Sequence, residues 1–153
     1  MPSLLFVCTG NLCRSPMAMV LFKDLLSREA RSDSWRVEST GIWAQAGRPT
    51  SEHAQHVMQE RGLDLSDHLS RPISSGLLKE FDLILVMEAR QLKAIRIEFP
   101  EVADRVHLLA EVAGEHSDVE DPYGKSLDTY RGTANKLSLL LDRGFDKIVS
   151  LME

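Results

Sequence analysis

The amino-acid sequence predicts an α/β fold, a single-domain doubly wound sandwich in which helices cover both faces of a four-stranded parallel sheet. Short apolar runs alternate along the chain with segments of helical periodicity, and this alternation is typical of a parallel sheet. The 153 residues suit one domain with its own hydrophobic core, which we expect to span residues 1–153. Hydrophobic residues make up 43% of the chain and charged residues 27%, so extensive disorder is not expected.

The N-terminal part is expected to supply two strands and one helix. Ser3–Val7 is a short apolar run, which predicts a buried strand. A helix is expected over Met17–Ala30, because Pro16 suits a first helical turn and apolar residues then recur at helical spacing. Arg36–Ser39 is predicted to form the second strand, and Gly41–Pro49 has the composition of a loop.

The middle of the chain is expected to hold a helix followed by the strongest strand of the sequence. Thr50 or Ser51 can cap the helix by accepting a hydrogen bond from a backbone N–H group. The helix would run to Arg61 and stop at Gly62, a residue type that tolerates the left-handed conformation. Asp82–Met87 reads DLILVM, an apolar run with the composition of a buried strand.

The C-terminal part is expected to complete the sheet and add the last long helix. Glu88–Ile97 has a helical composition, and Val106–Leu109 is predicted to form the fourth strand. Asp118–Lys125 is rich in turn-forming residues. Ser126–Arg143 carries apolar residues near helical spacing, and Gly144 is expected to end that helix. No element is assigned to residues 145–153.

The charge and the cysteine count exclude several kinds of protein. A formal net charge of −5 argues against non-specific binding to nucleic acid or to an anionic membrane. Two cysteines are too few for a disulfide-stabilised secreted domain, and the first residues lack the pattern of a secretory signal. We therefore expect a cytoplasmic protein without a membrane anchor. His53 and His56 lie three residues apart on a predicted helix, and we interpret them as a solvated face rather than as metal ligands.

The loop after the first strand is where a ligand site is expected, because parallel sheets bind ligands at the carboxyl ends of their strands. The six residues from Thr9 to Arg14 join a strand to a helix, so their backbone N–H groups can form an anion-binding nest. Gly10 and Asn11 tolerate the unusual backbone angles that such a nest needs.

Three side chains of this loop predict nucleophilic chemistry on an oxyanion. Cys8 lies at the mouth of the nest, where the pKa of its thiol should be lowered. Arg14 presents a planar pair of donors that matches two phosphate oxygens, and Ser15 can donate a hydrogen bond to the sulfur. An isolated cysteine would more simply be a small buried side chain, and an isolated arginine a surface charge. The spacing Cys-x5-Arg-Ser between a strand and a helix favours the catalytic interpretation.

The segment Val7–Pro16, V-C-T-G-N-L-C-R-S-P, resembles the phosphate-binding loop of the low-molecular-weight protein tyrosine phosphatases, which reads C-x-G-N-x-C-R-S-P. The resemblance is to bacterial-type members of that family and runs through most of the chain. Further segments that resemble the family are Ser39–Gly41 with Gly47–Pro49, His68–Arg71, Phe81–Met87 and Asp121–Gly124.

The resemblance implies a phosphotyrosine-protein phosphatase that forms a phosphocysteine intermediate and needs neither a metal nor a cofactor. Cys8 would be the nucleophile, Arg14 would bind the phosphate, and Asp121 would act as general acid and then as general base. Asp118 is the alternative acid. The phosphate-binding loop would comprise Thr9, Gly10, Asn11, Leu12, Cys13 and Ser15. The expected substrate is a phosphotyrosine-containing protein or another aryl phosphate, and the expected product is inorganic phosphate.

Supporting residues are implied in the same way. Ser39 and His68 match positions that hold the phosphate loop in shape together with Asn11. The cleft that takes the substrate ring would be lined by Leu12, Trp43 and Tyr123. Cys13 lies five residues from Cys8, and a reversible disulfide between them would protect the nucleophile from over-oxidation. A buried packing thiol is the alternative interpretation of Cys13.

Some features depart from the family or leave alternatives open. Met19 stands where the family usually has Glu, which puts one charged contact behind the loop in doubt. A thioredoxin-coupled arsenate reductase shares this fold and loop but needs later cysteines, and none follows Cys13. A phosphate-binding module without turnover is disfavoured by the presence of both Cys8 and Asp121. The choice between phosphotyrosine and phosphoarginine is not fixed by the sequence.

Overall fold

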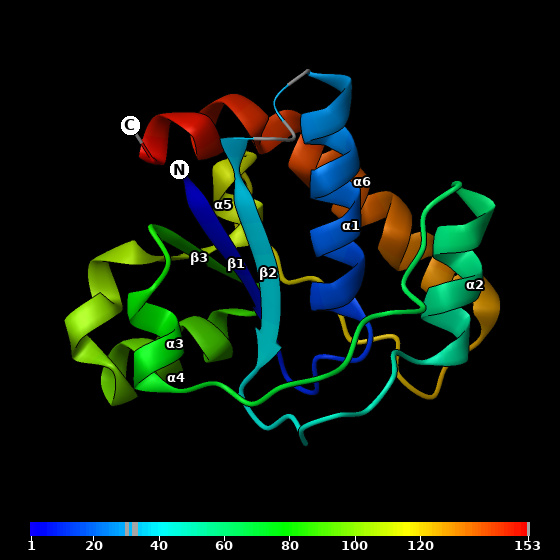
Figure 1. Cartoon of the computed structure of the whole chain (residues 1–153), viewed down its shortest axis with the longest axis horizontal. Helices are drawn as coiled ribbons and strands as arrows, with labels where there is room; N and C mark the ends of the chain where they lie inside the picture. Colours follow the sequence, from blue (N-terminus) through cyan, green and yellow to red (C-terminus); the bar gives the residue numbers. More distant parts are fainter. Residues whose placement is uncertain (30, 32–33, 153) are drawn as a thin grey trace.

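A computed structural model of the chain describes residues 1–29, 31 and 34–152, and its centre is one parallel sheet (Figure 1). The strands are β1 (Ser3–Cys8), β2 (Arg36–Gly41), β3 (Leu83–Val86) and β4 (Val106–Leu108), in the order β2-β1-β3-β4. β1 pairs with β2 on one side and β3 on the other, and β4 pairs with β3. The predicted α/β fold with a four-stranded parallel sheet is confirmed.

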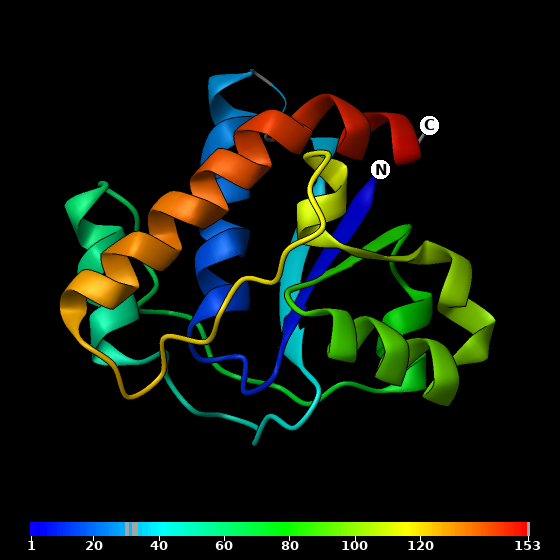
Figure 2. The ribbon, with the colours of Figure 1, turned by 180° about the vertical axis from the view of Figure 1, so that it is seen from behind.

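Helices lie on both sides of this sheet (Figures 1 and 2). They are α1 (Arg14–Arg28), α2 (Glu52–Glu60), α3 (Ser75–Lys79), α4 (Ala89–Glu98), the 3-10 helix η2 (Pro100–Arg105), α5 (Leu109–Val112) and α6 (Leu127–Leu151). Helices α1, α5 and α6 lie on one side, whereas α3 and α4 lie on the other. No helix in the described part of the chain has the length and hydrophobicity of a membrane span.

The central strands explain why two segments of the sequence are continuously apolar. β1 and β3 lie in the middle of the sheet, and every residue of both is buried. Helices cover both faces, so neither face can carry alternating polar residues. Phe6 of β1 packs edge-on against Phe22 of α1, and the ring centroid of Phe22 lies 5.5 Å from that of Trp35. These aromatic contacts attach α1 to the sheet.

The last helix is longer than predicted, because it continues through Gly144 to Leu151. Gly144 is buried against α5. A Cβ atom at this position would lie 2.6 Å from Cγ2 of Val112, closer than two carbon atoms can approach. The predicted helix end at Gly144 is wrong, because this glycine permits close packing between two helices rather than a reversal of the chain.

Other predicted boundaries differ by a few residues. α1 begins at Arg14, so the end of the expected loop is already helical. The expected helix end at Ala30 and the expected domain end at Glu153 lie outside the described residues. β2 continues to Gly41 because it pairs with β1 along its whole length. Leu109, predicted as the end of the fourth strand, is the first residue of α5.

The sequence does not predict the three short helices. Helix α3 has five residues and is capped by Ser74, whose Oγ accepts a hydrogen bond from the N–H of Leu77 at 3.1 Å. Helix α5 has four residues, and η2 has six residues and begins at Pro100. Segments of this length are too short to display a helical period of apolar residues.

The strand order creates a crevice between β1 and β3. The chain leaves β1 toward β2 on one side and later leaves β3 toward β4 on the other, so the two following connections diverge. In open parallel sheets such a point, beyond the carboxyl ends of the strands, is where ligands bind. The loop that follows β1 is the one with the Cys-x5-Arg spacing.

Candidate active site

The loop between β1 and α1 bends at Asn11. Its φ of 58° is in the left-handed region, and it is the only non-glycine residue with a positive φ in the described chain. Gly10, the other residue expected to tolerate unusual angles, does not have a positive φ. Asparagine is among the few residue types that adopt this conformation readily. The bend therefore depends on Asn11 rather than on the glycine before it.

The Asn11 side chain fixes the loop through three hydrogen bonds. Its Nδ2 donates to Oγ of Ser15 at 2.9 Å and to Oγ of Ser39 at 3.0 Å. Its Oδ1 accepts from the backbone N–H of Arg71 at 3.1 Å. Helix α1, strand β2 and the segment before α3 therefore all hold one fully buried residue of the loop.

The His68 side chain binds the backbone of Asn11. Its Nε2 lies 3.1 Å from the carbonyl oxygen of Asn11, and because a carbonyl only accepts, Nε2 carries the proton. Burial lowers the pKa of His68, the hydrogen bond to Asn11 opposes this shift, and the positive charges of Arg71 and Lys23 reinforce it. The ring is therefore mainly neutral at pH 7 and acts as a hydrogen-bond donor.

Cys8 ends β1, and its buried thiol lines a pocket at the carboxyl end of the sheet. Its Sγ lies 3.0 Å from Oγ of Ser15, which stands in the first turn of α1. A hydroxyl donor and a helix N-terminus therefore lie beside the sulfur. Both groups stabilise negative charge on a nearby atom.

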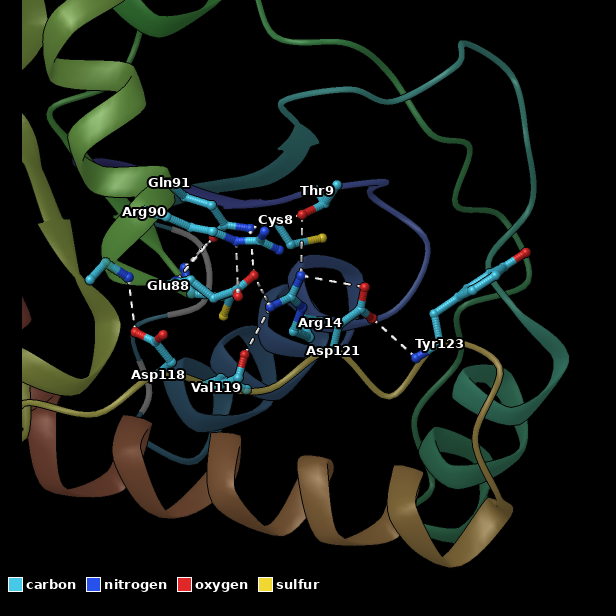
Figure 3. A network of polar contacts seen from close by, with 12 residues as sticks. Cys8, Thr9, Arg14, Glu88, Arg90, Gln91, Asp118, Val119, Asp121 and Tyr123 are labelled. Carbon is cyan, nitrogen blue, oxygen red and sulfur yellow. Dashed lines mark hydrogen bonds and ion pairs between the residues drawn. The ribbon is translucent and has the colours of Figure 1, made fainter.

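Arg14 is almost fully buried, with 1% of its side chain exposed, and its guanidinium crosses the crevice (Figure 3). Its Nη1 donates to Oε2 of Glu88 at 2.7 Å and to the carbonyl oxygen of Val119 at 2.8 Å. Its Nη2 has longer contacts, 3.4 Å to Oγ1 of Thr9 and 3.7 Å to Oδ2 of Asp121. Nε has no hydrogen-bond partner among the described residues. Nη1 is thus firmly held, whereas Nη2 and Nε can still donate hydrogen bonds to an anion.

Glu88 and Gln91, which the sequence motifs do not include, hold this arginine in place. Glu88 caps α4 in a reciprocal capping box with Gln91, the third residue of the helix. Nε2 of Gln91 also donates to Oγ1 of Thr9 at 3.0 Å and to Oε2 of Glu88 at 3.2 Å. The β3–α4 junction is therefore hydrogen-bonded to both the phosphate loop and Arg14. The spacing Glu-x-x-Gln directly after a predicted strand is the sequence signal that could have indicated it.

A pocket of about 280 Å³ brings the predicted catalytic residues together. It is lined by Cys8, Thr9, Gly10, Leu12, Cys13, Arg14, Arg48, Asp121 and Tyr123. The Asp121 side chain is 45% exposed, and its Oδ1 accepts from the backbone N–H of Tyr123 at 3.1 Å. Asp118, the alternative acid, does not line this pocket. Its Oδ1 instead accepts from the backbone N–H of Ala89 at 2.9 Å.

The walls of the pocket are only partly those expected for the substrate cleft. Leu12 and Tyr123 line it, and 56% of Tyr123 remains exposed. Trp43 lines a neighbouring hollow of about 130 Å³ that also contacts Thr9. Arg48, which follows Gly47 in the loop after β2, lines the catalytic pocket and was not among the expected cleft residues.

Cys13 is a free, buried thiol on the wall of the same pocket as Cys8. Its Sγ lies 3.3 Å from the hydroxyl of Tyr130 in α6 and 3.4 Å from Oγ of Ser51, the residue that caps α2. Burial raises the pKa of the Cys13 thiol, although the hydrogen bonds from Ser51 and Tyr130 oppose this effect. The thiol therefore connects the loop to two helices that are distant in sequence.

The described residues contain no cluster of three or more His, Cys, Asp or Glu side chains arranged to hold a metal ion. His53 packs its ring edge against Tyr130, with the ring centroids 5.2 Å apart. Nε2 of the exposed His56 lies 3.5 Å from Oε2 of Glu60, one turn further along α2. The pair expected to be a solvated face thus includes one ring in contact with α6.

Comparisons with known proteins agree with this geometry. The sequence model of the family described as low molecular weight phosphotyrosine protein phosphatase matches residues 3–148. A protein-arginine-phosphatase from Bacillus subtilis (strain 168) is 39% identical over 139 residues, which are 90% of this chain and 91% of that protein.

Solved structures show the same likeness. The crystal structure of a low molecular weight protein tyrosine phosphatase from T. tengcongensis superposes with a TM-score of 0.90 at 38% identity, covering 96% of this chain and 99% of that one. The YwlE arginine phosphatase, as a cysteine-to-serine mutant with a phosphorylated active-site serine, also has a TM-score of 0.90. It is 36% identical, over 96% of this chain and 95% of that one. The chain belongs to the low molecular weight phosphotyrosine protein phosphatase family and is a phosphatase enzyme.

Proposed function

We propose that the chain hydrolyses phosphate monoesters of proteins through a phosphocysteine intermediate on Cys8. The observation that supports this most is the single pocket in which Cys8, Arg14 and Asp121 meet, although Asp121 lies more than a hundred residues away in the sequence. Arg14 is the phosphate-binding residue in this proposal, and Asp121 is the general acid and base. The bound partner is a phosphorylated protein rather than a nucleic acid, in keeping with a net charge of −5.

The first step is attack of the Cys8 sulfur on phosphorus, in line with the ester oxygen that leaves. The S–P bond forms as the P–O bond breaks, and Asp121 donates its proton to the leaving oxygen. The backbone N–H groups of residues 9–14 and the free donors of Arg14 hold the other phosphate oxygens while negative charge spreads over them. The phosphorylated serine of the related arginine phosphatase supports attack from this position of the loop.

The second step is hydrolysis of the phosphocysteine. Asp121, now a carboxylate, takes a proton from water, whose oxygen attacks phosphorus as the S–P bond breaks. The Ser15 hydroxyl, 3.0 Å from Sγ, stabilises the departing thiolate. Inorganic phosphate leaves, and both residues return to their starting protonation states.

Turnover of p-nitrophenyl phosphate tests this mechanism. Replacing the nucleophile (Cys8→Ser) should reduce kcat by more than about a thousandfold while inorganic phosphate still binds. Asp121→Asn should slow phosphorylation of the enzyme by about 100- to 10,000-fold with little change in phosphate affinity. Full activity of Cys8→Ser, or phosphate binding by a wild-type protein without any turnover, would overturn the proposal.

We infer that phosphotyrosine is the preferred substrate. Leu12 and Tyr123 give the pocket an apolar and an aromatic wall, which suit a phenyl ring. Arg14 and Arg48 also line it, and Asp121 is the single carboxylate among the lining residues in the described chain. Because Arg14 is already paired with Glu88, a positively charged guanidinium next to the phosphate would meet the like charge of Arg48 and one carboxylate, so the electrostatics give phosphoarginine no net advantage.

Phosphoarginine is the second candidate, favoured by the similarity to a protein-arginine-phosphatase. The two are separated by measuring kcat/KM for peptides of the same sequence that carry either phosphotyrosine or phosphoarginine. We expect the phosphotyrosine peptide to have the larger value. A larger value for the phosphoarginine peptide reverses the assignment without affecting the roles of Cys8 and Asp121.

We also propose that Cys13 guards the nucleophile against oxidation. Peroxide would oxidise the Cys8 thiolate to a sulfenic acid, and the Cys13 sulfur would then displace water to form a disulfide that thiols reduce. The two cysteines line one pocket, which supports the pairing, and a reducing cytoplasm would keep both thiols free between oxidations. Recovery of activity with dithiothreitol after peroxide treatment should be large for the wild type and small for Cys13→Ser. Equal recovery would leave Cys13 as a packing thiol.

A further inference from the structure

We propose that Asp118 is a positioning residue for the general acid, because its side chain fastens the loop that carries Asp121 to the N-terminus of α4. The inference rests on the proposed role of Asp121. It also explains why the chain has two aspartates in one short loop but only one of them in the pocket.

Asp121 lies on a long connection with little structure of its own. Residues 113–126 join α5 to α6 and contain no helix or strand. Asp121 itself is held weakly, since its carboxylate is 45% exposed, bonds within its own loop to the N–H of Tyr123, and lies 3.7 Å from Nη2 of Arg14. The position of the acid must therefore be set by the residues that precede it.

Two neighbouring residues attach the loop to the β3–α4 junction (Figure 3). The backbone N–H of Val119 donates to the carbonyl oxygen of Met87 at 2.9 Å, and its carbonyl accepts from Arg14 at 2.8 Å. One residue earlier, Oδ1 of Asp118 accepts from the backbone N–H of Ala89 at 2.9 Å. The Val119 side chain is buried, so this part of the loop is fixed two residues before the acid.

The Asp118 contact differs from the others because it is made by a side chain of the loop itself, whereas the others reach the backbone of the loop. Any residue at position 119 except proline can make the two backbone bonds, and the backbone carbonyl of Asp118 accepts from Nζ of Lys136 at 2.6 Å. Without the Asp118 carboxylate, the loop is therefore held here, within the described chain, only through its backbone and the buried Val119 side chain. The Asp118 carboxylate adds a further point of attachment. Ala89 is the first residue of α4, a ten-residue helix. The backbone N–H of Ala89 therefore has no partner within the helix, and Asp118 binds it at the positive end of the helix dipole.

If Asp118 positions the acid, the loss of kcat/KM caused by removing its carboxylate should depend on the leaving group of the substrate. Proton donation by Asp121 matters most for esters of weakly acidic phenols, such as phenyl phosphate, and least for esters of acidic phenols, such as 2,4-dinitrophenyl phosphate. Loss of the Asp118 contact would leave the loop less firmly held and misplace the acid. It should therefore lower kcat/KM more for phenyl phosphate than for 2,4-dinitrophenyl phosphate. A merely structural defect would reduce kcat/KM for both substrates alike.

The test is kcat/KM for phenyl phosphate and for 2,4-dinitrophenyl phosphate in Asp118→Ala, Asp118→Asn, Asp24→Ala and Asp121→Asn. For Asp118→Ala we expect the loss with phenyl phosphate to exceed the loss with the dinitrophenyl ester by about three- to tenfold, the effect of one cap-like hydrogen bond. Asp118→Asn keeps an oxygen acceptor and should restore most of the ratio. Asp24→Ala breaks an exposed ion pair on α1 and serves as the matched control, with the ratio unchanged.

The outcomes separate the two proposals. If Asp121→Asn changes the ratio strongly but Asp118→Ala does not, Asp118 has no positioning role and the acid assignment stands. If neither variant changes the ratio, the assignment of Asp121 as the acid fails, and with it the inference about Asp118. A changed ratio in both variants, with recovery in Asp118→Asn, supports both proposals.

Discussion

At the scale of single residues, the site depends on Asn11 more than on any other residue outside the chemistry. It combines a left-handed backbone with three hydrogen bonds to three different parts of the chain. Glycine would satisfy the first requirement and not the second, whereas alanine would satisfy neither. The two requirements can therefore be separated by substitution.

Asn11→Ala should lower the free energy of unfolding by about 3 kcal/mol, from the lost hydrogen bonds and the strained φ. Asn11→Gly should cost about 1 kcal/mol less, because only the strain is relieved. Both variants should lose activity, since neither restores the bonds to Ser15 and Ser39. Urea denaturation measures the difference, and equal stabilities would show that the left-handed backbone carries no strain there.

His68 predicts a dependence of stability on pH. Its pKa is lowered in the folded state by burial, so the unfolded chain binds its proton first as the pH falls below about 6.5. Stability from this group is therefore complete above pH 6.5 and is lost as the pH falls toward the lower folded pKa, at up to about 1.4 kcal/mol per pH unit. His68→Gln should reduce this slope in denaturation measured between about pH 5 and pH 7. His107, whose pKa is also lowered by burial, should account for part of the remaining slope.

Prediction from the sequence reaches furthest at this scale where the residues of a site are adjacent. The loop from Cys8 to Ser15 is contiguous, so a nest with a candidate nucleophile and an arginine can be proposed from composition and spacing. The Glu-x-x-Gln spacing can indicate that Glu88 and Gln91 cap a helix, but it cannot indicate that they bind Arg14 and Thr9, which lie 74 and 82 residues away. Only the strand order of the sheet brings them together.

At the scale of elements, the packing of α6 on α5 shows how one residue type can have opposite meanings. Gly144 occurs where the helical pattern weakens, which indicates a helix end, yet it lies buried inside a helix of 25 residues. The competing requirement is close approach to Val112, which is not visible without the partner helix. A Cβ atom added at Gly132, in the same helix, would meet no neighbouring group within 4 Å among the described residues, so this glycine makes a natural comparison.

The two glycines predict opposite effects of the same substitution. Gly144→Ala should destabilise the fold by about 1–3 kcal/mol, because the added methyl group overlaps Val112 and outweighs the better helix propensity of alanine. Gly132→Ala should stabilise it by up to about 1 kcal/mol, the propensity gain alone. Thermal unfolding of both variants checks the signs. Val112→Ala combined with Gly144→Ala should be less destabilised than the sum of the two single changes, and strict additivity would argue against the overlap.

At the scale of the whole molecule, the site is an assembly of loops that only the complete sheet brings to one edge. The phosphate loop follows β1, Arg48 follows β2, Glu88 follows β3, and Asp121 comes from the connection before α6. By the proposed function, an anion bound in the pocket would contact groups from distant parts of the sequence. Phosphate should therefore stabilise the fold as a unit.

Inorganic phosphate at about a hundredfold excess over its Kd should add about 2.7 kcal/mol to the free energy of unfolding. For a chain of this size, that corresponds to a rise in Tm of about 5–10 °C. Arg14→Ala should abolish most of the rise, because its buried guanidinium supplies charged donors inside the pocket, whereas the other arginine of the lining, Arg48, is exposed. The control is sodium chloride at the same ionic strength, and an equal rise with chloride would show that the effect is non-specific.

The hydrogen bond from Arg14 to the carbonyl oxygen of Val119 joins residues 105 positions apart, and this separation matters while the chain is being synthesised. The cysteine-containing loop leaves the ribosome early, but its arginine has only Glu88 of its two close partners until the segment with Val119 and Asp121 has also emerged. We therefore expect a nascent chain to be inactive until most of it has been made, because the proposed general acid Asp121 is still missing. An enzyme that removes phosphate from other proteins thus cannot begin to work before its own fold is nearly complete.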